Sequence, residues 1–308
     1  MMTTYVRCVM TGVAGLVIAA CAADEPSAVT SELVAGQRYL ALGDSIPFGY
    51  NPVAAATTPY TIGAFIGYPD IIPPPNSDAN AACPGETSAS FIDPTAPDLG
   101  CHAWRAAGAA MHVDYASLGQ SQFQFALAYL AAHPETRTVS LHVGVNELRL
   151  LQGACIAAYP TDPNAAAQCI AAGAPGTIAA VAQRVGFVLS AIRQSGYAGK
   201  LIVVTYYELD YSNPADLTYQ GVLGLDRALV QVAQTPGLTA SIAGSFSAFQ
   251  PIAASAGGDC CAAGLLFRLP DGTCDVHPSN LGRAVLARAV LLAVPASTID
   301  LSAPTPRF

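Results

Sequence analysis

The sequence predicts an α/β domain built on a parallel sheet, because short apolar runs alternate with longer segments of helical periodicity. Three runs are predicted to be strands: YLAL at 39–42, VSLHV at 139–143 and LIVVTYY at 201–207. Each is short, continuous and rich in strand-forming residues, as is typical of strands covered on both faces. The chain has 308 residues, 52% of them hydrophobic and 11% charged, so it can bury the core of one such domain.

Helices are predicted between and after these strands, where apolar residues recur every three or four positions. The stripes are Phe123, Ala126, Leu127 and Leu130; Val181, Val185, Val188, Leu189 and Ile192; and Leu281, Val285, Ala289 and Leu292. We interpret all three stripes as core packing. Loops over 50–120, 208–220 and 250–273 are long for a compact domain, and such loops commonly form sites.

The first residues predict an export signal. One positive charge, Arg7, precedes an apolar run over 8–20 that is too short to span a bilayer comfortably. The end of this run, VIAAC, resembles the bacterial lipobox, in which the cysteine becomes the lipidated first residue. The alternative is an ordinary signal peptide cut nearby. We expect a signal peptide over 1–20, a lipid anchor on Cys21 that attaches the protein to a membrane, a tether over 21–36 and a single domain over 37–308.

Seven of the nine cysteines follow the leader region, and export predicts that most of them form disulfides. Their order along the chain suggests the pairs Cys83–Cys101, Cys155–Cys169, and Cys274 with either Cys260 or Cys261, which leaves one thiol over. No zinc-ligand spacing is present, and no metal or organic cofactor is expected. The net charge of −8 opposes binding to a phosphate backbone, so nucleic acid is not an expected partner.

Ser45 follows the first predicted strand directly, in LGDSIPFGY. That position puts a hydroxyl at the carboxyl edge of the sheet, where open α/β folds keep their sites. A nucleophilic serine needs a base and donors for the oxyanion. The elbow motif G-x-S-x-G of the α/β-hydrolases is absent. Asp44 adjoins the serine, and we expect it to fix the loop by a hydrogen bond rather than to act as the catalytic acid.

Three distant segments offer the other groups. Gly85 lies in a Pro-Gly turn, where a backbone N–H can approach a ligand closely. Asn146 follows the second predicted strand and carries a side-chain amide donor. His277 precedes the proline that opens the last predicted helix, whereas the other four histidines have no comparable setting.

Together the four segments resemble, in kind and in order, the blocks of the SGNH hydrolases, the GDSL esterase and lipase family. The blocks are LGDSIPFGY, CPGETSASFI, GVNEL and DVHPSNLG, and they span nearly the whole chain after the leader. The resemblance implies a three-layer, flavodoxin-like α/β/α fold with a roughly five-stranded parallel sheet. It also implies Ser45 as nucleophile, His277 as base, and an oxyanion hole formed by the backbone N–H groups of Ser45 and Gly85 and the side chain of Asn146.

Two positions depart from the family pattern. Glu147 stands where the third block usually has aspartate, which moves the carboxylate by one methylene. Cys274 stands three residues before His277, where the triad acid commonly lies. The nearest carboxylate is Asp275, so either Asp275 or a backbone carbonyl is expected to orient the imidazole.

The expected activity is hydrolysis of a small-molecule or lipid carboxylic ester by a monomer. A carbohydrate deacetylase or a phospholipase on the same scaffold is an alternative, as is a surface-anchored binding protein without catalysis. The sequence leaves the acyl chain length open.

Overall fold

The computed structural model describes residues 38–57, 61–72, 78–113, 115 and 118–302; the expected signal peptide, Cys21 and the tether lie outside them. A six-stranded sheet has the order β2-β1-β3-β4-β5-β8. Its strands are β1 (Arg38–Gly43), β2 (Asp78–Asn80), β3 (Thr136–His142), β4 (Lys200–Val204), β5 (Ala240–Ala243) and β8 (Val294–Pro295). The first five strands pair in parallel, and β8 pairs antiparallel with β5.

The predicted strands are present, with shifted ends. In β1 the four residues Tyr39 to Leu42 are at most 2% exposed, as expected for a strand covered on both faces. The third predicted strand is too long, because β4 ends at Val204. Beyond it the N–H of Tyr206 donates to the Asp226 carboxylate at 2.8 Å, which takes this backbone out of the ladder.

The expected fold class is confirmed, and the sheet has one strand more than the five that were expected. Five strands form the parallel sheet, and β8 adds a two-residue antiparallel edge. Both β2 and β8 are two or three residues long and contain no apolar run. Neither therefore carries a sequence pattern that predicts a strand.

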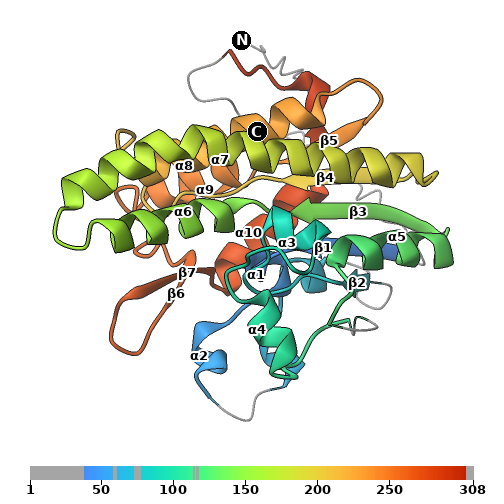
Figure 1. The fold of residues 1–308 in the computed structure, drawn as a ribbon, viewed down its shortest axis with the longest axis horizontal. Coiled ribbons are helices and arrows are strands. Elements are labelled where there is room, and N and C mark those ends of the chain that lie inside the picture. The colour runs from blue at the N-terminus through green and yellow to red at the C-terminus, as the bar shows by residue number, and fades with distance from the viewer. Residues whose placement is uncertain (1–37, 58–60, 73–77, 114, 116–117, 303–308) are drawn as a thin grey trace, which may run out of the picture. The chain divides into compact units, whose positions relative to one another are not determined.

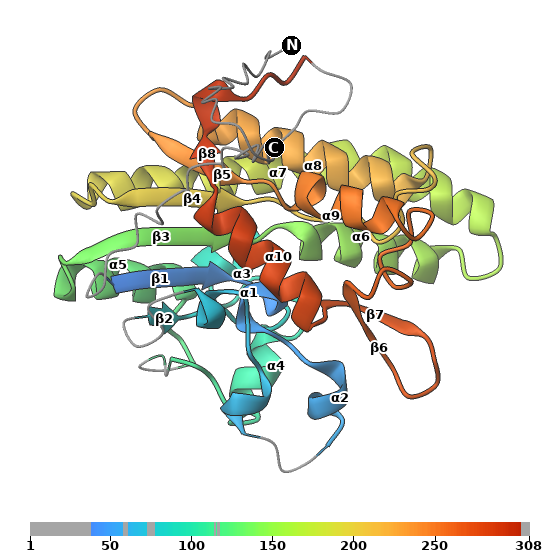
Figure 2. The same cartoon turned by 180° about the vertical axis from the view of Figure 1, so that it is seen from behind.

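Helices cover both faces of the sheet. In Figure 1, α5 (Gln122–Ala132) and α7 (Pro163–Gln194) lie in front of the strands; in Figure 2, seen from behind, α10 (Asn280–Leu291) does, and the short α1 (Ser45–Phe48) lies at the end of β1. The α8 helix (Leu217–Ala233) packs against α7, β4 and β5. The other helices are α2 (Pro52–Ala55), α3 (Ser88–Ile92), α4 (Cys101–Ala106), α6 (Val145–Ala158) and α9 (Ser245–Ala254), with 3₁₀ turns at Ile62–Ala64, Pro69–Ile71 and Ala296–Thr298.

The α7 helix, 32 residues long, is the one described helix long and apolar enough to cross a membrane, by length and composition alone. Its C-terminal half carries the predicted stripe from Val181 to Ile192, whose five members are buried. Its N-terminal half pairs with α6 through the Cys155–Cys169 disulfide. The second half is therefore part of the core, as the stripe predicts.

A separate two-stranded hairpin, β6 (Leu266–Arg268) with β7 (Cys274–Pro278), precedes α10. The Cys261–Cys274 disulfide ties the start of β7 to the loop before β6. Cys83–Cys101 is the third disulfide, so the first two expected pairs are present and the third uses Cys261. Cys260 is free and buried, with its thiol directed at the Glu208 carbonyl at 3.1 Å. Burial raises the pKa of this thiol to about 12.

Candidate active site

The site forms where β1 and β3 end side by side. Ser45 is the first residue of α1, directly after β1, and Asn146 is in the first turn of α6, shortly after β3. The two strands are in parallel register, with Gly43 opposite His142, and the N–H of Asp44 donates to the His142 carbonyl at 3.1 Å. This edge is the switch point of the strand order, where ligands of open α/β sheets bind.

Ser45, His277 and Asp275 lie in one chain of hydrogen bonds. His277 Nε2 is 2.9 Å from Ser45 Oγ, although 232 residues separate them in sequence. Its Nδ1 hydrogen-bonds to Asp275 Oδ1, and that same oxygen accepts the His277 backbone N–H at 2.9 Å. Of the two orienting groups left open by the sequence, the structure has the carboxylate.

The charge of Asp275 suits a partner that becomes an imidazolium. Burial alone would raise the pKa of this carboxyl, but the hydrogen bonds and charge of His277 outweigh it, and the pKa is lowered. A buried tyrosine holds the strand in place, since the Tyr207 hydroxyl donates to the Val276 carbonyl at 2.7 Å. The carboxylate is therefore ionised at neutral pH and fixed against the ring.

Gly85 lies in the left-handed region, with a φ of 82°, in the turn that follows Cys83. A Cβ at this position would lie 2.5 Å from the Leu99 carbonyl carbon, so the turn has room only for glycine. The Gly85 carbonyl accepts the Leu99 N–H at 2.8 Å, and the Cys83–Cys101 disulfide links the same two segments. Neither Gly85 nor Ser45 donates its backbone N–H to another described residue.

Asn146 is buried, and its Nδ2 donates to the Glu86 carbonyl at 2.8 Å. This bond uses one of the two amide hydrogens and sets the direction of the other. Asn146, Gly85, Ser45 and His277 all line one cavity of about 740 Å³. The structure thus brings together every site residue expected in the domain, with Asp275 among the lining residues.

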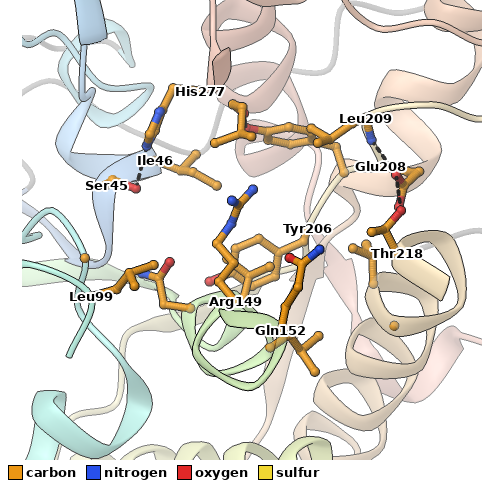
Figure 3. A pocket seen from close by; sticks show the side chains of 18 of the residues that line it. Ser45, Ile46, Leu99, Arg149, Gln152, Tyr206, Glu208, Leu209, Thr218 and His277 are labelled. Carbon is orange, nitrogen blue, oxygen red and sulfur yellow. Dashed lines mark hydrogen bonds between the residues drawn. The ribbon is translucent and has the colours of Figure 1, made fainter. Parts of the chain in front are cut away.

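The cavity extends from Ser45 between α6 and α8, and Figure 3 shows Arg149 and Gln152 pointing into it from α6. Much of its wall is apolar, from Ile46, Leu99, Trp104, Leu148, Ile170, Leu217, Val222 and Val276. Four of its residues, Ile170, Ala174, Leu217 and Gly221, also line a second cavity between α7 and α8. The two cavities together offer an apolar path away from the serine.

Asp44 fixes the serine loop, as expected from the sequence. Its carboxylate accepts the Ile46 N–H at 2.9 Å and the Tyr206 hydroxyl at 2.6 Å, and it is fully buried. Burial raises its pKa to about 7, although both hydrogen bonds lower it. These bonds join the end of β1 to the end of β4.

Glu147, one of the two residues that depart from the family pattern, joins the second block to the third. Its carboxylate accepts hydrogen bonds from the N–H of Ser88, at 2.6 Å, and from the Ser88 hydroxyl. Ser88 is the first residue of α3, so the longer side chain anchors the start of that helix to the start of α6. Arg184 of α7 lies 3.9 Å from the same carboxylate oxygen.

Gln122 and Glu86 were not predicted as site residues, yet they join the end of β1, the start of α5 and the turn that carries Gly85. The Gln122 amide accepts the Gly43 N–H at 2.5 Å and donates to the Gly43 carbonyl at 3.0 Å. It also donates to the Glu86 carboxylate at 3.0 Å. Glu86 stands in the second block, CPGETSASFI, and Gln122 stands in the stretch GQSQFQFALAYLAAHP before the third block.

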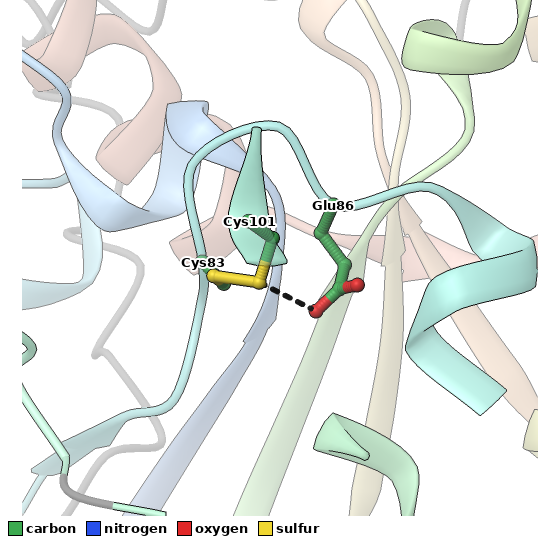
Figure 4. A group of neighbouring side chains, drawn as sticks. All are labelled: Cys83, Glu86 and Cys101. Carbon is green, nitrogen blue, oxygen red and sulfur yellow. Dashed lines mark hydrogen bonds between the residues drawn. A yellow bond between two sulfur atoms is a disulfide. The ribbon is translucent and has the colours of Figure 1, made fainter. Parts of the chain in front are cut away.

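Glu86 packs against the Cys83–Cys101 disulfide, as Figure 4 shows. Its carboxylate lies 3.6 Å from the Cys101 sulfur, and burial raises its pKa to about 7. The three residues lie close enough to hold a metal ion. Both sulfurs are bonded to each other, however, so they have no thiolate to offer, and the group does not fit a metal.

His142 lies at the end of β3 without a catalytic contact. It is fully buried between the rings of Tyr68 and Tyr206, with centroids 5.9 and 4.4 Å away, and neither ring nitrogen has a hydrogen-bond partner among the described residues. Burial lowers its pKa to about 3, so the ring is neutral and serves as packing.

No family model and no curated protein matches the chain. Solved structures resemble it over most of its length at low sequence identity. An acetylxylan esterase from Geobacillus stearothermophilus is 15% identical, covers 83% of this chain and 93% of its own, and has a TM-score of 0.48. An α/β hydrolase from the metagenome of Lake Arreo, Spain, is 14% identical, with 85% and 95% covered and a TM-score of 0.49. A protein described as a GDSL-like lipase, from Parabacteroides merdae, is 12% identical, with 85% and 95% covered and a TM-score of 0.48.

The chain has the fold expected of an SGNH hydrolase. The order β2-β1-β3-β4-β5 of its parallel strands is that of flavodoxin-like sheets. The four sequence blocks lie at one end of this sheet and line the same cavity.

The raised pKa of Glu86 predicts that stability decreases as pH increases. A carboxyl whose folded pKa is raised stabilises the fold fully below its unfolded pKa of about 4.5, and this contribution is lost as pH rises through about 7. Glu86 alone would then lower the free energy of unfolding by about 3 kcal/mol between pH 4.5 and pH 8. We expect Glu86→Gln, which stays neutral, to lose less stability over this range in urea unfolding.

Glu135→Gln is the matched control, because Glu135 is exposed and its pKa is lowered rather than raised. An equal pH dependence in the parent and in Glu86→Gln would mean that Glu86 is ionised in the fold at neutral pH.

Proposed function

We propose that the protein is a serine esterase of the SGNH type that hydrolyses carboxylic esters. The observation that carries this proposal is the hydrogen-bonded series from Ser45 Oγ through His277 to Asp275, at the mouth of a cavity that Gly85 and Asn146 also line. A serine paired with an imidazole, which is in turn paired with a carboxylate, is the arrangement that activates a hydroxyl for acyl transfer.

In the first half of the reaction, Ser45 Oγ attacks the ester carbonyl carbon and its proton passes to His277 Nε2. Asp275 stabilises the imidazolium. The negative charge that develops on the carbonyl oxygen faces the N–H groups of Ser45 and Gly85 and the amide of Asn146. When the C–O bond to the alcohol breaks, His277 returns the proton to the leaving oxygen, and an acyl-enzyme remains.

In the second half, a water molecule attacks the acyl-enzyme carbonyl while His277 Nε2 takes one of its protons. Collapse of the second tetrahedral intermediate releases the carboxylic acid and returns the proton to Ser45 Oγ. The sum is one ester and one water converted to one acid and one alcohol, with no cofactor required.

The three disulfides support a location outside the cytoplasm, in an oxidising compartment. We further propose that the protein is exported through residues 1–20 and lipidated on Cys21, with residues 21–36 as the tether to the domain. The sequence VIAAC supports this step.

Replacement of the triad acid tests the mechanism. Asp275→Asn removes the charge that holds the imidazole, and we expect kcat to fall about 10⁴-fold on 4-nitrophenyl butyrate. Ser45→Ala should abolish turnover above background. Circular dichroism serves to check that both variants fold. An effect of Asp275→Asn below tenfold would favour a backbone carbonyl in its role, and a parent inactive on every ester would favour a binding protein.

Asn146→Ala tests the oxyanion hole. Loss of one donor typically lowers kcat about 10²- to 10³-fold, because the developing charge loses a preorganised hydrogen bond. Since Asn146 also holds the Glu86 carbonyl, circular dichroism and thermal unfolding of this variant check that the turn stays in place. Unchanged kcat would remove Asn146 from the hole.

The apolar path predicts a preference for esters with long acyl chains over acetates. Each buried methylene contributes about 0.8 kcal/mol, so kcat/KM should be at least about tenfold higher for 4-nitrophenyl octanoate than for the acetate. Gly221 lines both cavities, so the side chain of Gly221→Leu should narrow the path between them. The backbone can accept this side chain, because a Cβ there would lie 3.7 Å from its nearest neighbour, Leu148. We expect this variant to lose octanoate activity selectively, whereas faster turnover of acetate by the parent would support a deacetylase.

Lipidation predicts that the full chain, expressed in a bacterium, sediments with membranes and that Cys21→Ala moves it to the soluble fraction. Cys8→Ala, in the same leader region, is the matched control and should stay with the membranes. Recovery of Cys21→Ala in the membrane fraction at parental levels would contradict an anchor on this residue.

A further inference from the structure

Arg149 lies in the cavity of the proposed active site without a protein partner. It is the only Lys or Arg among the described residues that line this cavity. Its guanidinium forms no ion pair and no hydrogen bond with another described residue. By contrast, Arg193 donates to four backbone carbonyls, and Arg283 to the Gly49 carbonyl and the Asn280 side chain. Arginine in a mainly apolar cavity thus keeps its donors available to a ligand.

Each of the three carboxylates in the cavity wall accepts at least one hydrogen bond from another protein group, although Glu208 Oε2 has no partner among the described residues. Asp275 is bonded to His277, and Glu208 accepts the Leu209 N–H at 2.8 Å. Asp216 caps the start of α8 by accepting the Thr218 N–H at 2.8 Å. The guanidinium lies near enough to Asp44 and Asp275 to interact with their charges, so it is close to the catalytic groups.

Gln152 follows Arg149 by three residues on α6, which places both side chains on one face of the helix. Figure 3 shows both pointing into the cavity that holds Ser45 and His277. Gln152 also has no hydrogen-bond partner among the described residues. A guanidinium beside an amide presents several N–H donors in one direction, which suits the oxygens of a carboxylate or a phosphate.

We propose that Arg149 and Gln152 bind an anionic group, a carboxylate or a phosphate, on the ester substrate. The inference rests on the proposed esterase function and adds the substrate class: an ester with an apolar part and one negative charge. The charge belongs either to the acyl part or to the alcohol part, and both are compatible with the position of Arg149.

Two matched pairs of substrates test the proposal in the intact domain. The first places the charge on the alcohol part: 4-(butanoyloxy)benzoate against the neutral 4-(butanoyloxy)benzamide. The second places it on the acyl part: 4-nitrophenyl hydrogen adipate against 4-nitrophenyl hexanoate. The readout is the preference, the ratio of kcat/KM for the anionic member to that for the neutral one.

We expect the parent to prefer the anionic member of one pair, and Arg149→Gln to lower that preference by about 10- to 100-fold, mainly through KM. Arg149→Lys keeps a point charge and should retain part of the preference. Gln152→Ala should lower it by a smaller factor. Arg288→Gln is the control, because it removes the same charge from an exposed position on α10 and should leave the preference at the parental value.

Two outcomes overturn the proposal. In the first, the parent shows no preference in either pair. In the second, Arg149→Gln lowers kcat/KM for both members of a pair equally, which would mean that the guanidinium supports Asp275 rather than the substrate. Failure of the esterase function itself is distinct, because neutral esters would then show no turnover that depends on Ser45.

Discussion

The buried amide of Gln122 is the contact on which the geometry of the site depends. It hydrogen-bonds to the N–H and the carbonyl of Gly43 and to the Glu86 carboxylate. It therefore joins the strand before the serine to the turn that carries Gly85. Asn146 adds a second bond to the same turn through the Glu86 carbonyl. The Gly43 carbonyl also accepts the Cys83 N–H at 3.0 Å. An unpaired backbone group at this depth would cost about 1 to 3 kcal/mol, so Gln122 stabilises this loop chiefly by pairing with the Gly43 N–H.

A parallel sheet makes this arrangement possible. All its principal strands end at one edge, and each loop there can exchange hydrogen bonds with its neighbours. Asp44 connects the end of β1 to Tyr206 after β4, and Tyr207 connects that segment to β7. The serine, the amide and the imidazole therefore hold their relative positions through side chains that do not take part in the chemistry.

The fold and the residues that meet in the candidate site were predictable because they follow from local patterns. Strands covered on both faces show as apolar runs, and residues such as Ser45 and His277 stand next to glycine and proline in short blocks. The strands β2 and β8 were not predictable, because a polar or two-residue strand owes its pairing to its neighbours. The roles of Gln122 and Arg149 could not be predicted for a related reason. A single polar residue on a helix forms no repeating sequence pattern, and its role depends on tertiary contacts with segments far away in sequence. The choice of Cys261 over the adjacent Cys260 likewise required knowledge of which sulfur faces Cys274.

The adjacent residues Cys260 and Cys261 affect how readily the Cys261–Cys274 disulfide undergoes thiol exchange. A free thiol beside a disulfide is normally positioned for exchange, but the attacking species is the thiolate. The Cys260 sulfur is buried against Glu208, and burial raises its pKa to about 12, so little thiolate is present at neutral pH to attack the bond formed by its neighbour. In the native fold this burial disfavours exchange at the Cys261–Cys274 disulfide, which directly precedes Asp275.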